Sequence, residues 1–209
     1  MTAPDLAALV SARLCHDLIS PMGAIGNGLE LMQLSGTPGA AELELVNESL
    51  ANALAKVRFY RIAFGPAEPH GRLALEEVDQ ITEAMFTGRF TASWTAQAID
   101  LPRSTARLAC LALLCLEKSL PMGGHVRVEV GRARVSLAVE GRRTAPPQAL
   151  WAHVRDGAPL GELKPDGIQF ALLRQKLAEG EQRLEASFDD TSAEIGIIAD
   201  RPAMAEAQP

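Results

Sequence analysis

Two apolar stripes at helical spacing run through the first 64 residues, separated by a short break. In the first segment the apolar residues recur every three or four positions: Val10, Leu14, Leu18, Met22, Ile25, Leu29 and Met32. After a Gly/Pro-containing break at residues 35–39, the second segment repeats the pattern with Leu43, Val46, Leu50, Ala53, Val57, Tyr60 and Phe64. This period places each set on one side of an α-helix, and the short break predicts an antiparallel helical hairpin.

A single hairpin buries two such stripes poorly. Two hairpins packed face to face form a four-helix bundle with a closed core, so the pattern predicts a homodimer. The alternative is that the second half of the same chain covers the hairpin. In either case residues 1–65 are expected to form a helical hairpin domain.

The rest of the chain alternates between helical and strand patterns after a linker-like stretch at residues 66–72. Helices are expected at residues 76–87, 103–120, 146–156 and 167–179, and strands at residues 90–96, 125–130, 134–140, 182–188 and 193–199. This order predicts an α/β layer domain over residues 66–200. Residues 201–209 are expected to be a disordered tail.

Composition excludes several classes of protein. A net charge of −6 and a pI near 5.3 give no electrostatic basis for binding nucleic acid. No apolar run reaches the length of roughly 18–20 residues that a membrane span needs, and no basic segment of a secretory signal is present. The three cysteines form no CxxC pair and the four histidines are scattered, so no metal site and a reducing, cytoplasmic location are expected.

His16 is the most informative residue of the hairpin. It lies two positions from both Leu14 and Leu18, roughly 160–200° around the helix from the apolar stripe, so its imidazole is expected to face outward. A strip of mostly small or polar residues surrounds it and is expected to form a partner-binding surface: Ala12, Arg13, Ser20, Gly23 and Asn27.

Asp17 and Ser20 complete the candidate catalytic group with His16. A carboxylate near one ring nitrogen can hold the imidazole in the tautomer that leaves the other nitrogen nucleophilic. Ser20 lies one turn further along the helix and can donate a hydrogen bond to a bound oxyanion or a water molecule.

Pro21 is unusual in the middle of a helical pattern. It lacks the N–H that would bond to the carbonyl of Asp17, which costs roughly 3 kcal/mol, and Gly23, Gly26 and Gly28 cost about 1 kcal/mol each relative to alanine. Residues that oppose local stability are expected at functional sites. The alternative is that Pro21 ends one helix and a second begins, but the apolar stripe continues beyond it.

The segment from His16 to Pro21 (HDLISP) resembles the phosphoacceptor box of sensor histidine kinases. The second half resembles their ATP-binding domain in a degenerate form. The asparagine that would hold Mg²⁺ falls at about Cys115, with its upstream partner at about Leu111, and neither residue offers a hard oxygen ligand. The DxGxG box is replaced by residues 139–143 (VEGRR), and Gln169 stands where the last glycine-rich box has a glycine.

An intact histidine box, a hairpin and a degenerate ATPase domain together are similar to the ChpT-type histidine phosphotransferases of alphaproteobacterial phosphorelays. Residues 58–65 (RFYRIAFG) share that likeness. The resemblance implies a cytoplasmic homodimer that takes a phosphoryl group from the receiver domain of a hybrid histidine kinase onto His16. It then passes the group to response-regulator receiver domains, with no cofactor of its own and with Mg²⁺ on the receiver.

Two roles are considered for each of several basic residues, and three for the whole chain. Arg13 is expected either to pair with phosphoryl oxygens or acidic receiver residues, or to be plainly solvated. Lys56, Arg58 and Arg61 either rim the docking cleft or are solvated. The alternatives for function are an ATP-dependent histidine kinase core with a divergent nucleotide site and a receiver-binding module without chemistry.

Overall fold

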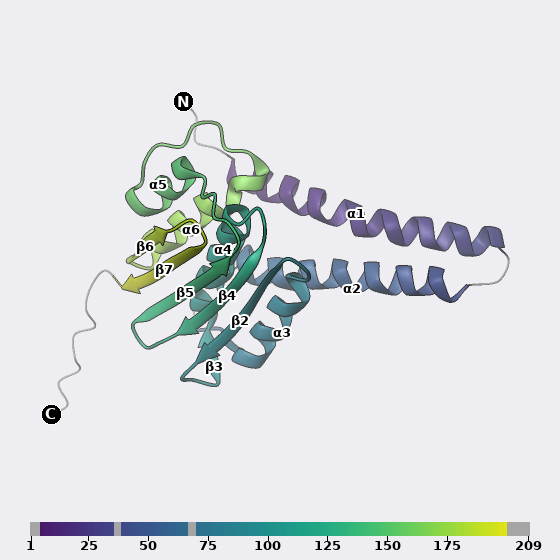
Figure 1. The fold of residues 1–209 in the computed structure, drawn as a ribbon, viewed down its shortest axis with the longest axis horizontal. Helices are drawn as coiled ribbons and strands as arrows, with labels where there is room; N and C mark the ends of the chain where they lie inside the picture. Colours follow the sequence, from purple (N-terminus) through teal and green to yellow (C-terminus); the bar gives the residue numbers. More distant parts are fainter. Residues whose placement is uncertain (1–4, 36–38, 67–69, 200–209) are drawn as a thin grey trace.

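The computed structural model describes residues 5–35, 39–66 and 70–199. The long helices α1 (Leu6–Ser35) and α2 (Ala40–Ala63) form an antiparallel hairpin that projects from an α/β domain (Figure 1). Helix α1 begins after Asp5, whose side chain accepts a hydrogen bond from the backbone N–H of Ala8 at 3.1 Å. It continues through Pro21 without interruption, so the interpretation in which Pro21 ends a helix is wrong.

The second half contains every predicted helix and strand. In chain order the elements are β1 (Arg72–Ala74), α3 (Leu75–Met85), β2 (Phe90–Ala96), β3 (Asp100–Pro102), α4 (Arg103–Ser119), β4 (Gly124–Val130), β5 (Arg134–Gly141), α5 (Gln148–Asp156), the 3₁₀ turn η1 (Pro165–Gly167), α6 (Ile168–Glu179), β6 (Gln182–Phe188) and β7 (Ser192–Ala199). The pair β1–β3 was not predicted, because strands this short show no period. The predicted tail at residues 201–209 lies outside the described residues.

The main sheet has the strand order β2-β4-β5-β7-β6. Strands β2 and β4 are parallel, and the other neighbours are antiparallel. Alternation along β4 turns Val126 and Val128 into the core and leaves Arg127 and Glu129 exposed. The apolar helix α4 is buried along most of its length, because it contacts α2, α6 and the sheet.

The hairpin and the α/β domain share one hydrophobic core. Phe59, Tyr60, Ile62 and Ala63 near the end of α2 belong to the same buried cluster as the residues of α4. The Phe59 ring packs edge-on against Phe86 with a centroid distance of 5.1 Å. For this part of α2, the second half of the chain does cover the hairpin.

Apolar residues toward the tip of the hairpin stay exposed in the single chain. The exposed fractions are 62% for Met22, 47% for Leu29, 45% for Leu43 and 46% for Leu50, and all four lie on the predicted stripes. Nearby, Gly28 permits close approach of the two helices, since a Cβ atom there would lie 2.6 Å from Cγ2 of Val46. The hairpin is therefore tightly packed along its own axis but has an apolar surface that no part of the described chain covers.

Candidate functional site

His16 lies on the outer face of α1, as predicted. Its side chain is 84% exposed, and its Nδ1 atom lies 3.0 Å from Oδ1 of Asp17. A carboxylate can only accept in this contact, so Nδ1 carries the proton and Nε2 carries the free lone pair. The arrangement exposes Nε2 of His16 to solvent as a nucleophile, while Asp17 holds Nδ1 of the same ring.

Asp17 is held at its second oxygen as well. Oδ2 accepts hydrogen bonds from Nε of Arg13, at 2.5 Å, and from the hydroxyl of Tyr60. Arg13 also reaches the backbone carbonyl of Asp166 in η1 at 3.5 Å. The alternative in which Arg13 is plainly solvated is wrong, because the i to i+4 spacing on α1 brings its largely buried guanidinium to Asp17. Pairing of Arg13 with phosphoryl oxygens or acidic receiver residues stays a prediction.

The hydrogen bonds decide the charge of Asp17. Burial alone would raise the pKa of its carboxyl group, but hydrogen bonds from Tyr60, His16 and Arg13 outweigh burial and hold the pKa below its usual value. Burial, and then the hydrogen bond to Asp17, raises the pKa of Tyr60 far above that of a free phenol. Asp17 is therefore ionised at neutral pH, and Tyr60 keeps the proton that it donates.

Lys56 holds the backbone of the same residue. Its Nζ donates to the carbonyl oxygen of Asp17 at 3.0 Å. This carbonyl would normally accept the N–H four residues later, which Pro21 lacks. Lys56 thus supplies the hydrogen bond that Pro21 removes.

The second domain places further charges behind Asp17. Burial raises the pKa of Glu117 on α4; the charge of Asp17 adds to this effect, whereas Arg13 and Lys56 oppose it. The next residue, Lys118, forms an ion pair with the Asp166 side chain. The site on α1 is therefore built on groups from α2, α4 and η1.

The remaining residues of the predicted strip share the exposed face of α1. Ala12, Ser20, Gly23 and Asn27 are all exposed there with His16. Ser20 also borders a cavity of about 300 Å³ between α1 and α2, which Glu48, Ser49, Asn52 and Lys56 line from the α2 side. Whether a partner docks on this strip stays a prediction.

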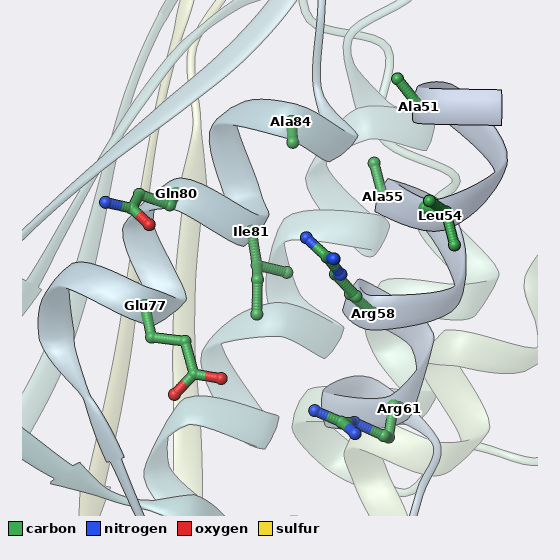
Figure 2. A pocket seen from close by; sticks show the side chains of 9 residues that line it. All are labelled: Ala51, Leu54, Ala55, Arg58, Arg61, Glu77, Gln80, Ile81 and Ala84. Atoms are coloured by element: carbon green, nitrogen blue, oxygen red, sulfur yellow. The ribbon is translucent and has the colours of Figure 1, made fainter. Parts of the chain in front are cut away.

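Arg58 and Arg61 are not brought to His16. They line a different cavity, of about 410 Å³, between α2 and α3, together with Glu77 and Gln80 (Figure 2). Arg58 lies two residues from both Lys56 and Tyr60, so it points roughly 160–200° away from the face of α2 that holds Asp17. These arginines therefore do not lie with His16 on one face, and whether they rim a docking cleft for a partner stays a prediction.

The sequence reasoning missed the roles of Tyr60 and Lys56. Tyr60 was placed on the apolar stripe, but its hydroxyl was a signal, since a buried tyrosine normally finds a hydrogen-bond partner. Lys56 could have been recognised from the carbonyl that Pro21 leaves without a donor. Neither partner could be named without knowing the register of the two helices.

The positions of the lost nucleotide boxes lie inside the core. Leu111 and Cys115 are fully buried, and Gln169 is 2% exposed, with its Nε2 donating to the carbonyl of Asp166 at 3.0 Å. Nearby, the buried Trp151 ring packs against Phe170 with a centroid distance of 5.4 Å. These side chains are therefore part of the core, and the loss of nucleotide binding that they suggest stays a prediction.

Comparison with known proteins identifies the class. Residues 75–192 match the family described as histidine phosphotransferase C-terminal domain. The chain belongs to this histidine phosphotransferase family, and it is a phosphotransferase. It is 34% identical over 211 residues to the protein phosphotransferase ChpT of Brucella abortus (strain 2308), with 96% of this chain and 97% of the relative covered.

A solved phosphotransferase structure agrees with this assignment. A bacterial phosphotransferase superposes with a TM-score of 0.78 at 27% sequence identity, covering 94% of this chain and 97% of the other. The histidine kinase domain of the Erythrobacter litoralis EL346 blue-light activated histidine kinase matches at 19% identity with a TM-score of 0.44, over 93% of each chain. Among the described helices, none is both long and apolar enough to cross a bilayer.

Proposed function

We propose that the chain carries a phosphoryl group on His16 and exchanges it with aspartates of receiver domains in the cytoplasm. The donor is the receiver domain of a hybrid histidine kinase, and the acceptors are receiver domains of response regulators. The observation that carries this proposal is the exposed imidazole whose Nδ1 is held by ionised Asp17. Nε2 is then the nucleophile, available to a partner that approaches the outer face of α1.

In the exchange, Nε2 of His16 attacks the phosphorus of an aspartyl phosphate. The N–P bond forms as the bond between phosphorus and the aspartate oxygen breaks, and the receiver carboxylate leaves with the electron pair. The imidazole ring becomes positively charged, and Asp17 stabilises this charge through the Nδ1–H hydrogen bond. The same steps in reverse pass the group to another receiver.

The partner supplies what this chain lacks. Phosphoryl transfer depends on positioning and on neutralising the oxygens of the transferred group. We expect the receiver domain to bring Mg²⁺, while this chain needs no cofactor. Ser20, one turn from His16, can donate a hydrogen bond to a phosphoryl oxygen. The short side chains of Ala12, Gly23 and Asn27 on the same face allow a receiver domain to come close to His16.

Two copies of the chain are proposed to pair through their hairpins. The exposed residues Met22, Leu29, Leu43 and Leu50 continue the helical stripes and lack a partner within the described chain. Joining two such hairpins would bury these residues in a four-helix bundle and leave one His16 strip on each outer face.

A histidine kinase core that uses ATP is the competing function. It is disfavoured because Leu111 and Cys115, where the Mg²⁺ ligands would stand, are fully buried and offer no hard oxygen. Calorimetry with Mg-ATP tests this point, and micromolar affinity would favour the kinase.

The decisive experiment is incubation of the purified protein with a receiver domain phosphorylated on its aspartate with ³²P. We expect acid-labile label on this chain, its loss in His16→Ala, and its retention in the control His70→Ala, which removes another exposed histidine. His16→Ala should still bind the receiver. If wild-type protein binds phosphorylated receivers but takes no label, the module without chemistry is the correct function.

A further inference from the structure

Tyr60 has a fixed position next to the phosphoacceptor site. It is the only tyrosine of the chain and is 4% exposed. Its ring stacks on Phe64 with a centroid distance of 5.1 Å and meets Phe59 edge-on at 6.2 Å. Since Phe59 belongs to the core shared with the α/β domain, the Tyr60 hydroxyl is anchored to the body of the protein and not to α1.

The two oxygens of Asp17 have different partners. Oδ1 faces Nδ1 of His16, while Oδ2 accepts from Tyr60 and from Arg13. Arg13 lies on the same helix as Asp17, and its contact beyond that helix is the 3.5 Å hydrogen bond to the backbone carbonyl of Asp166 in η1. Tyr60 comes from α2, and therefore it sets the rotation of the carboxylate against a rigid reference.

We propose that Tyr60 is a positioning residue for phosphoryl exchange: by holding Oδ2 of Asp17, it aims Oδ1 at His16 and keeps the proton of the imidazole on Nδ1. The inference rests on the proposed function of His16. Tyr60 does not contact the imidazole, so its effect passes through Asp17. At metal sites, removing a group that orients a ligating side chain from behind commonly changes affinity or activity tenfold or more, and an effect of about this size is expected here.

The phenol of Tyr60 also stays protonated, as a group that must always donate to Oδ2 of Asp17 requires. The raised pKa of Tyr60 keeps the phenol protonated over the whole physiological range, so it is a permanent donor. Without it, Oδ2 would lose the donor that α2 supplies, and the carboxylate could rotate with Arg13 on α1. The imidazole would then sample both neutral tautomers, and Nε2 would be the free nitrogen for only part of the time.

Tyr60→Phe tests the proposal because it removes one oxygen and keeps the buried ring. We expect transfer from a phosphorylated receiver to slow about tenfold, with receiver affinity unchanged. In ¹⁵N-labelled protein, long-range ¹H–¹⁵N spectra should show His16 protonated on Nδ1 in the wild type and a tautomer mixture in the variant. Thr82→Val is the matched control, because it removes another buried hydroxyl, on α3, and should change neither readout.

A double-mutant cycle with Asp17→Asn separates positioning from general destabilisation. Tyr60→Phe should have little further effect on rate or tautomer once Asp17 is replaced; an equal effect in both backgrounds would overturn the inference. A wild-type rate and a wild-type tautomer in Tyr60→Phe would also overturn it, while the proposed function would stand. If the wild type takes no label at all, the proposed function fails, and the tautomer spectra still decide whether Tyr60 orients His16.

A second measurement does not depend on the folding of Tyr60→Phe. Because Tyr60 is the single tyrosine, 3-fluorotyrosine incorporated at every tyrosine codon labels this position alone. The ¹⁹F resonance should shift on Asp17→Asn and stay in place on His70→Ala. An unmoved resonance in Asp17→Asn would show that the two residues do not interact in solution, and the inference would be wrong.

Discussion

The two ends of the hairpin follow the same helical pattern but have different surroundings. The near half, residues 6–21 and 53–63, lies against the α/β domain, and there Phe59, Tyr60 and Ile62 are buried. The far half, residues 22–35 and 40–52, projects away from that domain (Figure 1), and there Met22 and Leu43 stay exposed. The second half of the chain therefore covers one side of α2 at the near end, whereas at the far end only the proposed pairing of two copies would cover the exposed apolar residues.

The difference in burial between the two halves corresponds to a fixed geometry around His16 in one half and an exposed apolar surface in the other. The near half contains His16 and Asp17, whose contacts with Arg13, Lys56 and Tyr60 demand a fixed geometry. The core shared with the second domain provides this rigidity. The far half contains none of these contacts, and its exposed leucines are the residues proposed to hold two copies together.

The largest effect on stability is expected when a buried aromatic side chain of the near half is shortened to alanine. Phe59→Ala removes a fully buried ring from the shared core and should lower the free energy of unfolding by about 3–5 kcal/mol. Leu43→Ala, in the exposed far half, is the control and should cost much less under conditions where the protein is monomeric. Urea unfolding followed by circular dichroism measures both. Equal losses would mean that the two halves are not distinguished by their packing.

The next largest effect should be on association through the far half. Leu50→Asp places a charge in the proposed dimer interface in both copies, so the dissociation constant should rise about a hundredfold or more. Ala41→Asp adds the same charge on the opposite side of α2 and serves as the control. Sedimentation equilibrium gives the constants. A wild-type protein that remains monomeric at high concentration would contradict the dimer outright.

Much of this arrangement could be read from residue spacing, because a helix repeats locally. The period predicted the hairpin and the outward direction of His16, and the carboxylate beside it was visible because Asp17 is the next residue. It could not show that Phe59 and Ile62, which lie off the stripe, pack on the α/β domain. Nor could it reveal Arg107 of α4, whose guanidinium donates to the carbonyls of Ile62 and Gly65 at the end of α2. The two hydrogen bonds of Arg107 join residues more than 40 positions apart, and no local pattern encodes them.

A smaller and more specific effect should link Lys56 with Pro21 in the near half. Lys56→Met leaves the carbonyl of Asp17 without a donor and should cost about 1–3 kcal/mol. In a Pro21→Ala background, the new N–H can bond to that carbonyl, so the same Lys56→Met change should cost about 1 kcal/mol less. Urea unfolding of the four proteins gives the coupling. Strictly additive losses would show that Lys56 does not replace the bond that Pro21 removes.

The smallest effect is expected on the melting temperature, when the charged groups next to the near half are neutralised. Burial, and then the charge of Asp17, raises the pKa of Glu117, so ionising it in the folded protein costs more than in the unfolded chain. Glu117→Gln should therefore raise the melting temperature at pH 7, and the gain should disappear as the pH falls below about 4, where the unfolded carboxyl is also protonated.

Asp17→Asn should show the opposite sign, because the pKa of Asp17 is lowered. The loss of stability in this variant is present at pH 7 and disappears as the pH falls through that lowered pKa. Melting curves at both pH values distinguish the two cases. A lower melting temperature for Glu117→Gln at pH 7 would mean that attraction to Arg13 and Lys56 outweighs burial, and Glu117 would then join the groups that stabilise the site.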